Sequence, residues 1–320
     1  MEKLPIIIIA GPTAGGKTKV SVALAKKING EIISADSMQI YKYMDIGTAK
    51  ITKDEMQGIP HYLIDELEPD EAYSVAEFQK RGRAHLHAIA EKGKTPIIVG
   101  GTGFYINALL YDNQFTETEK DDKFREKLYA LAKEKGSAYI HSRLNDVDPE
   151  AAAVIHQNNI KRVIRALEFY EQTNLKISDH NKEEQLRTSN YAAEIAILSV
   201  ERPLLYQRIE ARVDEMLRTG LVDEVRGLLA RGYARTLVSM QGIGYKEIVC
   251  YLENEIDFDT AVSELKKATR HFAKRQLTWF HRQIEGAWYD VSSFENADAL
   301  AAEIAGAFLK SVKTAQSAYI

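Results

Sequence analysis

The chain has 320 residues and a formal net charge of −4, from 42 Lys and Arg against 46 Asp and Glu. An apolar fraction of 45% and a charged fraction of 28% are typical of a globular protein, which excludes collagen-like, coiled-coil and wholly disordered chains. The one cysteine, Cys250, excludes a disulfide within the chain and a cysteine-rich zinc site.

Short apolar runs alternate with amphipathic segments in the first third of the chain. Their spacing predicts strands at Ile6–Ala10, Glu31–Ala35, His61–Leu67 and Pro96–Val99, and helices at Lys17–Ile28 and Tyr73–Glu91. Strands that alternate with helices in this way predict an α/β fold, in which helices cover both faces of a parallel sheet.

The middle of the chain lacks this alternation. The pattern predicts helices at Asp122–Lys135 and Asn158–Gln172 and a polar connector at Ser178–Ser189. A strand at Ala193–Val200 then precedes helices at Leu204–Arg231, Gly244–Leu252 and Ala261–Arg282 and a last strand at Ala287–Val291. We therefore predict a first core part at 1–114, a helical insertion at 115–191, and a second core part at 192–320 that contains a basic C-terminal helix.

A glycine-rich loop of the form G-x-x-x-x-G-K-T separates the first strand from the first helix. Its residues are Gly11, Pro12, Thr13, Ala14, Gly15, Gly16, Lys17 and Thr18. Such a P-loop binds phosphate through its amides and the helix N-terminus, while Lys17 adds a full charge and the Thr18 hydroxyl can ligate Mg²⁺. If the phosphate belongs to ATP, the chain is a small-molecule or nucleoside kinase, with Asp65 and Glu66 as candidate metal-holding carboxylates.

Two further segments follow strands at the edge where this loop emerges. Asp36 directly follows the second predicted strand, and Gly100, Gly101, Thr102 and Gly103 follow the fourth. Ligands of doubly wound sheets collect outside the carboxyl ends of the strands, so both segments are candidate site residues. The alternatives are an ordinary turn or helix cap at Asp36 and a helix-starting turn at the glycines.

Basic residues cluster in two places. From Leu265 to Ile284 there are six Lys or Arg and no Asp or Glu, and Lys266, Arg270 and Lys274 share one helix face. Lys161, Arg162 and Arg165 form a second cluster in the insertion. Two basic clusters in a net-acidic chain favour contact with a polyanion, although each alone is also typical of a solvated helix face.

Eight segments, in order along the chain, carry a family resemblance. They are Gly11–Thr18, Ser34–Lys50, His61–Asp65, Val99–Tyr105, Asn158–Glu168, Glu201–Leu217, Gln241–Glu247 and Lys274–Phe280. With these segments the sequence resembles the bacterial tRNA dimethylallyltransferases, also called tRNA isopentenyltransferases. It departs from the family at Gly15, where serine is usual, and it lacks the C-terminal zinc finger of the eukaryotic relatives.

The resemblance implies a reaction. A dimethylallyl group passes from dimethylallyl diphosphate to N6 of the adenosine immediately 3′ of the anticodon, tRNA position 37, and diphosphate is released. The P-loop then holds a departing diphosphate, with Mg²⁺ on Thr18. The catalytic residues that it implies are Asp36 as general base, with Thr13 and Arg212 on the diphosphate side; Arg208 is a further candidate.

The resemblance also implies contacts with the anticodon stem-loop of tRNA. The implied residues are Asp36, Ser37, Met38 and Gln39; Thr102; Arg125; Lys161, Arg162, Val163, Ile164 and Arg165; and Gln241, Gly242, Ile243, Gly244, Tyr245 and Lys246. With no signal peptide or membrane-spanning run apparent, we expect a cytoplasmic monomer without a membrane partner. Two other interpretations stay open: the kinase, and a non-catalytic tRNA-binding module that no longer uses its P-loop.

Overall fold

The computed structural model describes residues 3–111, 121–185 and 188–317. The chain divides into two compact units, which we call the core unit, Met1–Tyr111 with Ser189–Ile320, and the helical unit, Asp112–Thr188. The helical unit occupies nearly the same stretch of sequence as the predicted insertion at 115–191.

The described part of the core unit contains a sheet of six parallel strands in the order β3-β2-β4-β1-β5-β6. The strands are β1 (Leu4–Ala10), β2 (Gly30–Ser34), β3 (His61–Tyr62), β4 (Thr95–Gly100), β5 (Tyr191–Ser199) and β6 (Ala287–Asp290). The predicted α/β class is confirmed. After β1 the chain crosses β4 to form β2, and after β4 it crosses β1 to form β5, so the winding direction reverses between β1 and β4.

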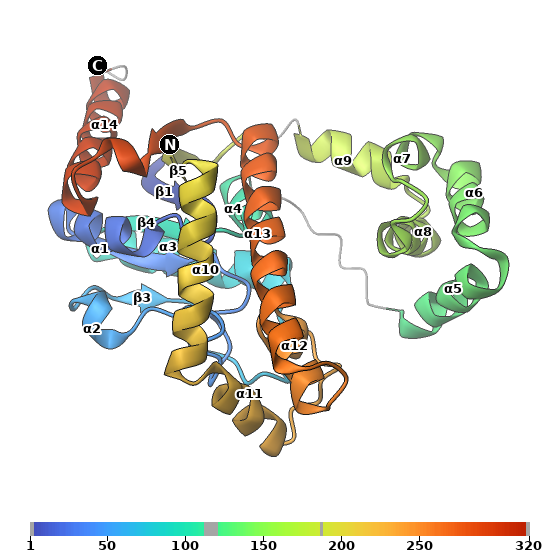
Figure 1. Ribbon diagram of the computed structural model, residues 1–320. Helices are drawn as coiled ribbons and strands as arrows, with labels where there is room; N and C mark the ends of the chain where they lie inside the picture. The colour runs from blue at the N-terminus through green and yellow to red at the C-terminus, as the bar shows by residue number, and fades with distance from the viewer. Residues whose placement is uncertain (1–2, 112–120, 186–187, 318–320) are drawn as a thin grey trace. The chain divides into compact units, whose positions relative to one another are not determined.

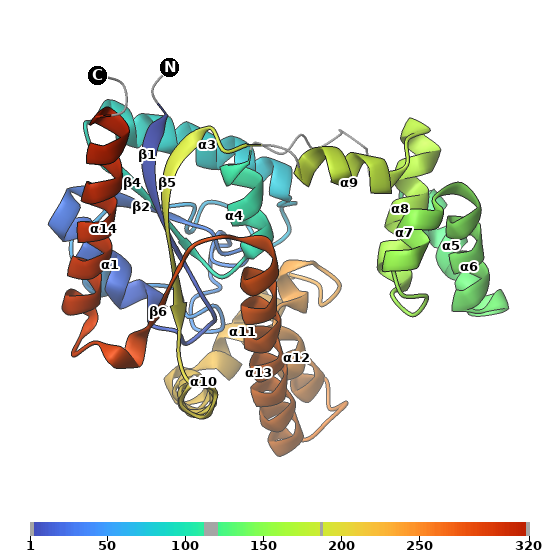
Figure 2. The ribbon, with the colours of Figure 1, turned by 90° about the horizontal axis from the view of Figure 1, so that it is seen from above.

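Helices cover both faces of this sheet because alternate strand side chains point to opposite sides. Ile7 and Ile9 of β1 pack with α1 (Lys17–Ile28) and α14 (Ala297–Ser317). Ile6 and Ile8 pack in a second cluster with α3 (Val75–Glu91) and α4 (Gly103–Leu110). All four isoleucines are fully buried, and each such burial contributes about 1.5–3 kcal/mol. Figure 2 shows the two helix layers on either side of the strands.

Further helices follow β5. They are α10 (Arg202–Thr219), α11 (Leu221–Ala230), α12 (Tyr245–Leu252) and α13 (Phe258–Gln283), with a short 3₁₀ turn at Ser239–Gln241. α10 and α13 lie side by side (Figure 1) and bury Leu205, Ile209 and Ala273 between them. The single helix predicted at Leu204–Arg231 is wrong, because Gly220 adopts a left-handed conformation, with φ 109°, that ends α10.

Other features of the core unit also differ from the sequence prediction. The strand predicted at His61–Leu67 stops at Tyr62, because Leu63 and Asp65 adopt left-handed φ angles of 61° and 57° that a strand does not accommodate. A four-residue helix, α2 (Lys53–Met56), precedes β3, and a second 3₁₀ turn, Val291–Ser293, leads from β6 toward α14. Helix α14 lies outside the predicted elements.

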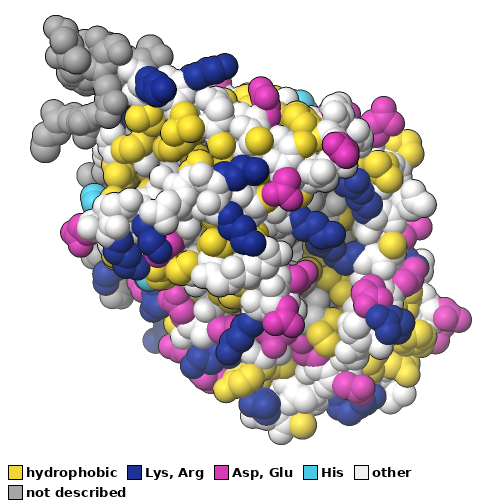
Figure 3. Space-filling view, turned by 90° about the vertical axis from the view of Figure 1, so that its left-hand side faces the viewer, with side chains coloured by type: hydrophobic (Ala, Val, Ile, Leu, Met, Phe, Trp, Pro, Cys, Tyr) yellow, Lys and Arg dark blue, Asp and Glu magenta, His cyan; other side chains and the backbone are white. Residues whose placement is uncertain are grey.

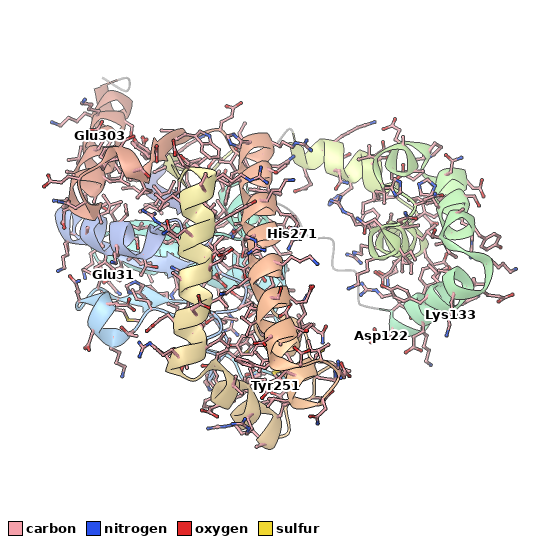
Figure 4. The ribbon with its side chains drawn as sticks, viewed as in Figure 1. Glu31, Asp122, Lys133, Tyr251, His271 and Glu303 are labelled. Atoms are coloured by element: carbon pink, nitrogen blue, oxygen red, sulfur yellow. The ribbon has the colours of Figure 1, made fainter. Side chains whose placement is uncertain are left out.

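The described part of the helical unit is built from α5 (Asp122–Lys135), α6 (Ser137–Val147), α7 (Pro149–Val154), α8 (Ile160–Thr173) and α9 (Ile177–Gln185). Its apolar core contains Leu128, Leu144 and Leu167. Figure 4 marks Asp122 and Lys133 on α5. α9 replaces most of the predicted connector at Ser178–Ser189. It is stabilised by a residue distant in sequence, since the buried Asp148 carboxylate accepts a hydrogen bond from the Ser178 N–H at 3.0 Å.

Neither unit offers a membrane span: no helix in the described ranges combines the length and apolar character needed to cross a bilayer.

Candidate functional site

The carboxyl ends of three neighbouring strands bring the predicted site segments together. Ala10 at the end of β1 pairs with Gly100 at the end of β4, and the Ala35 amide donates to Val99 O at 2.7 Å. The Thr102 amide in turn donates to Ala35 O at 3.3 Å, so Thr102 lies beside the residue that precedes Asp36. The P-loop, Asp36 and Thr102 therefore share one edge of the sheet, where the winding reverses and ligands are expected.

A glycine at the end of β4 allows these segments to meet. A Cβ atom on Gly100 would lie 2.2 Å from Ala35 O, far inside van der Waals contact. Any side chain at this position would separate β4 from the segment that carries Asp36. Gly100 is thus required for the close approach, not only for a turn.

The P-loop is folded around its lysine. Lys17 Nζ donates to Gly11 O at 3.0 Å and to Pro12 O at 2.8 Å, while the Gly15 amide donates to Pro12 O at 3.1 Å. A Cβ on Gly15 would lie 2.9 Å from Pro12 O, so the serine that is usual in the resembling family requires a shift in this turn. Ala14 packs against α10 and α13 in a small apolar cluster, which supports the loop from behind.

The charged groups at this edge influence one another. Burial lowers the pKa of Lys17 to about 8, the positive charge of Arg212 lowers it as well, and Asp36 opposes the shift. Burial also lowers the pKa of Arg212. Two cations thus share a partly buried environment beside the P-loop, where an anion with several oxygens would relieve their repulsion.

Asp36 has the properties of a base. Its Oδ1 accepts the amides of Met38 at 2.9 Å and Gln39 at 3.4 Å, which fixes the carboxylate against its own turn. Among the residues that the structure describes, Oδ2 has no hydrogen-bond partner. Burial raises the pKa of Asp36, although the Met38 amide and Lys17 oppose the shift. A fixed carboxylate with a raised pKa and one open oxygen can accept a proton from a bound substrate.

The remaining residues predicted for the diphosphate side occupy two helices and the loop. Thr18 is exposed in the first turn of α1. Arg208 and Arg212 are partly buried and lie one turn apart on α10. The Thr13 amide donates to Gln276 Oε1 at 2.9 Å. Gln276, on α13, is absent from the predicted site, although it lies within the matching segment Lys274–Phe280.

The segments predicted to contact tRNA in the core unit pack against each other. A Cβ on Gly242 would lie 2.6 Å from Met38 Cε, so the segment after β2 rests on the loop before α12. Gln39 accepts the Ser34 hydroxyl at 3.2 Å and is directed into its own segment. Tyr245 is fully buried and donates to Glu224 at 2.6 Å. A tRNA contact through the Tyr245 side chain is incompatible with that burial.

A hollow of about 200 Å³, which we call the basic hollow, lies between α13 and the segment at the start of α12. Its lining residues are Ile243, Lys246, Glu264, Lys267, Ala268, His271 and Arg275. The lining contains three Lys or Arg and one histidine, which Figure 4 marks on α13, against one carboxylate. That carboxylate, Glu264, pairs with Lys267 at 3.1 Å. In contrast, the side of the core unit formed by α1 and α14 shows positive and negative side chains interspersed (Figure 3). The hollow is therefore a candidate surface for the phosphates of a nucleic acid.

Part of the basic face predicted on α13 has another role. Lys266 pairs with Asp214 at 2.5 Å and Arg270 with Glu210 at 2.6 Å, and both acidic residues lie on α10. These two cations connect neighbouring helices, which corrects the expectation that the whole face meets a polyanion. Lys274, in the same row, is exposed.

The helical unit holds the other predicted tRNA contacts. Arg125 donates twice to the buried Glu168, at 2.7 Å each, and Arg165 donates to the same carboxylate at 2.7 Å. Val163 and Ile164 are 1% exposed within the core of this unit, so their side chains cannot contact tRNA. The exposed basic residues of the predicted run are Lys161 and Arg162.

The carboxylates considered for a kinase are engaged in ion pairs. Asp65 pairs with Lys50 at 2.5 Å and Glu66 with Arg81 at 3.1 Å. The described ranges also contain no group of three or more His, Cys, Asp and Glu placed to hold a metal. Mg²⁺ does not need such a group, since it commonly binds through one or two protein oxygens together with substrate phosphates and water. Thr18, at the mouth of the loop, fits that kind of site.

Comparison with known proteins gives the same assignment along most of the chain. Residues 39–283 match the sequence model of the IPP transferase family. The chain is 53% identical to the tRNA dimethylallyltransferase of Lachnoclostridium phytofermentans over 92% of this chain and 94% of that protein. It is 50% identical to the tRNA dimethylallyltransferase of Bacillus anthracis over 96% of this chain and 97% of that one.

Solved structures agree. The tRNA isopentenylpyrophosphate transferase of Bacillus halodurans superposes with a TM-score of 0.75 at 42% identity and covers 99% of both chains. A eukaryotic dimethylallyltransferase described as acting on tRNA superposes with a TM-score of 0.77 at 30% identity, over 94% of this chain and 78% of that one. The likeness thus extends over sequence, fold and nearly the full length.

Proposed function

Because the chain belongs to the IPP transferase family, we propose that it is a tRNA dimethylallyltransferase. It moves a dimethylallyl group from dimethylallyl diphosphate to N6 of the adenosine immediately 3′ of the anticodon, tRNA position 37, and releases diphosphate. The relatives at 50% identity and above carry this name. The observation in the structure that supports it is the P-loop, with Lys17 and Arg212, beside a carboxylate at one edge of the sheet.

The chemistry needs a base and an anion site together. The exocyclic amine of adenine is a weak nucleophile because its lone pair is delocalised into the ring. In the transfer, the bond from nitrogen to the allylic carbon forms, the carbon–oxygen bond to diphosphate breaks, and the amine proton passes to Asp36. General base catalysis of this kind contributes typically about 10²–10⁴-fold. Lys17, Arg212 and the loop amides stabilise the negative charge that develops on the diphosphate.

Bound magnesium would support the same step. The Thr18 hydroxyl and the diphosphate oxygens would hold Mg²⁺, which when bound neutralises part of the leaving group's charge. Thr13 belongs to the loop that holds this group. We expect chelation of Mg²⁺ by EDTA to abolish transfer, and replenishment of the metal to restore it.

The base must leave its stack to reach Asp36 and Thr102. Bases of a single-stranded loop are turned out more easily than those of a duplex, which suits an anticodon loop as substrate. The basic hollow beside α12, and Lys161 and Arg162 of the helical unit, supply cations for the tRNA backbone. Where tRNA is the substrate, the protein works in the cytoplasm, and a monomer contains every residue that the reaction uses.

One assay tests this proposal. Purified protein with dimethylallyl diphosphate, Mg²⁺ and unmodified tRNA should add the mass of one dimethylallyl group, located at position 37 by nuclease digestion and mass spectrometry. No added mass on any tRNA with adenosine at that position contradicts the transferase. ATP consumption that depends on a small acceptor and not on tRNA would favour the kinase instead.

A further inference from the structure

Gln276 connects the P-loop to the turn after β4. It lies on α13, is 7% exposed, and reaches both segments with its amide group. We propose that Gln276 is a positioning residue of the transfer reaction, which sets the P-loop against the Gly100–Thr102 turn. The inference rests on the proposed function and deepens it.

The amide of Gln276 uses both of its ends. Oε1 accepts the Thr13 amide at 2.9 Å, and Nε2 donates to Gly101 O at 3.0 Å. One contact needs an acceptor and the other needs a donor, at adjacent atoms of one planar group. A carboxylate offers two acceptors, so in its ionised form it would face the Gly101 carbonyl with repulsion. The site therefore selects an amide, or a carboxyl group that keeps its proton.

The chain leaves just enough space for this contact. A Cβ on Gly101 would lie 2.1 Å from Gln276 Nε2, and a Cβ on Gly103 would lie 2.0 Å from the Trp279 ring. Two glycines thus let α13 approach the turn after β4 directly. On the loop side, Ala273 of α13 packs in one cluster with Ala14. The helix meets the P-loop at two successive residues, by packing at Ala14 and by a hydrogen bond at Thr13.

The consequence for the reaction is geometric. Gln276 accepts a hydrogen bond from the Thr13 amide and so fixes that peptide. The start of the loop that binds the diphosphate is fixed with it. The second bond fixes the Gly101 carbonyl next to Thr102, on the side where the base is expected. One side chain thus holds the segments that position both the leaving group and the nucleophile. Misplacement by about 1 Å can cost about 10²-fold in rate.

Gln276→Glu gives a test that a merely structural role would not satisfy. When protonated, the introduced carboxyl group donates to Gly101 O and accepts from Thr13, as the amide does; when ionised, it cannot donate. We expect kcat/KM for dimethylallyl diphosphate, divided by the wild-type value at the same pH, to fall about 10²-fold at pH 8 and to rise as the pH is lowered. Lys17, Arg212 and Asp36 carry charge at the same edge, and division by the wild-type value removes the part of their titration that the two proteins share.

Three further proteins complete the test. Gln276→Leu removes both hydrogen bonds and should lose activity with a ratio that does not depend on pH. Gln283→Glu places the same substitution at an exposed position on the same helix and should match the wild type. Gly101→Ala displaces the Gln276 amide without altering its chemistry, so this variant replaces Gln276→Leu in the test if Gln276→Leu fails to fold. Thermal melting shows whether each variant is folded.

Calorimetry with pyrophosphate separates this inference from the proposed function. The affinity of Gln276→Glu for pyrophosphate, relative to the wild type, should recover toward low pH even if no tRNA is ever modified. A ratio that stays flat with pH in both activity and pyrophosphate affinity overturns the inference, as does wild-type behaviour of Gln276→Leu. If the wild type binds pyrophosphate but transfers nothing, the proposed function fails and the positioning role is still decided by the binding data.

Discussion

At the scale of single residues, Lys17 combines a position in the predicted phosphate-binding loop with a lowered pKa. Its ammonium is charged below pH 8 and loses its proton as the pH rises above about 8. In the proposed function a diphosphate binds the charged form, so the wild-type affinity divided by that of Lys17→Arg at the same pH should fall by up to about tenfold for each pH unit above 8. Arginine stays protonated, and the ionisation of pyrophosphate itself is common to both proteins. Calorimetric titration of pyrophosphate between pH 7 and pH 9.5 would measure this ratio, and a ratio that does not change with pH would contradict the role of Lys17.

In the proposed reaction, the chemistry depends on Asp36 as the proton acceptor. Asp36→Asn removes the proton acceptor but keeps the shape, so we expect kcat to fall about 10²–10⁴-fold. Pyrophosphate affinity should hold or increase, because a negative charge near the diphosphate is lost. Asp70→Asn, at an exposed carboxylate in the loop after β3, is the matched control. Equal losses of turnover and tRNA affinity in Asp36→Asn would mean that Asp36 is only a binding residue.

At the scale of elements, α13 divides its basic residues between two tasks. Arg275 lines the basic hollow, whereas Arg270 pairs with Glu210 on α10. Arg275→Gln should weaken tRNA binding and reduce the slope of log affinity against log salt by about one, the value for one lost phosphate contact. Arg270→Gln, the same change five residues earlier on the helix, should leave the slope unaltered and lower the melting temperature instead. A reversed pattern in filter-binding titrations would contradict the division.

The elements also indicate where sequence patterns are informative. β1, α1, β2 and β4 are predictable because short β-branched runs and glycine turns are local signals. The break at Gly220 and the end of β3 depend on left-handed residues within apolar stretches, which hydrophobic periodicity does not detect. The sequence pattern does not predict α9, because a buried carboxylate from outside the helix, Asp148, stabilises its start.

The candidate site was predictable to a similar degree and for similar reasons. Strand ends of a parallel sheet necessarily gather, so the P-loop, Asp36 and Thr102 could be placed together from the sequence. A motif does not reveal whether a residue touches a ligand or supports one that does. Val163, Ile164 and Tyr245 are buried, and Gln276 acts on main-chain groups far away in sequence. Such roles depend on packing between segments.

At the scale of the whole molecule, a buried carboxylate connects the outer strands to α3. Burial raises the pKa of Glu31, but hydrogen bonds from Lys94, Tyr62 and Lys92 lower it more, to about 2. Because the folded-state pKa of Glu31 lies below the unfolded value, its ionised carboxylate stabilises the folded state. This contribution to stability is present above pH 4.5 and is lost as the pH falls toward 2. Each unit of this pKa shift is worth about 1.4 kcal/mol. Glu31→Gln should therefore reduce the free energy of unfolding by at most about 3 kcal/mol at pH 7.

Denaturant unfolding of Glu31→Gln and the wild type between pH 7 and pH 3 tests this expectation. The difference between the two proteins should narrow as the pH falls below 4.5. Glu303→Gln changes an exposed glutamate on α14, which Figure 4 marks together with Glu31, and should alter stability little. A difference between Glu31→Gln and the wild type that is independent of pH would assign the effect to packing instead.

The position of β1 between β4 and β5 also bears on how the protein is made. About 180 residues separate the end of β1 from the start of β5. At about 5–20 residues per second, a ribosome needs on the order of 10–40 s to deliver that second neighbour. Throughout this interval one edge of an isoleucine-rich strand in the nascent chain lacks its partner, while the helical unit, which has an apolar core of its own, emerges. Slow translation before β5 should therefore favour aggregation, and chaperone dependence should concentrate in that window.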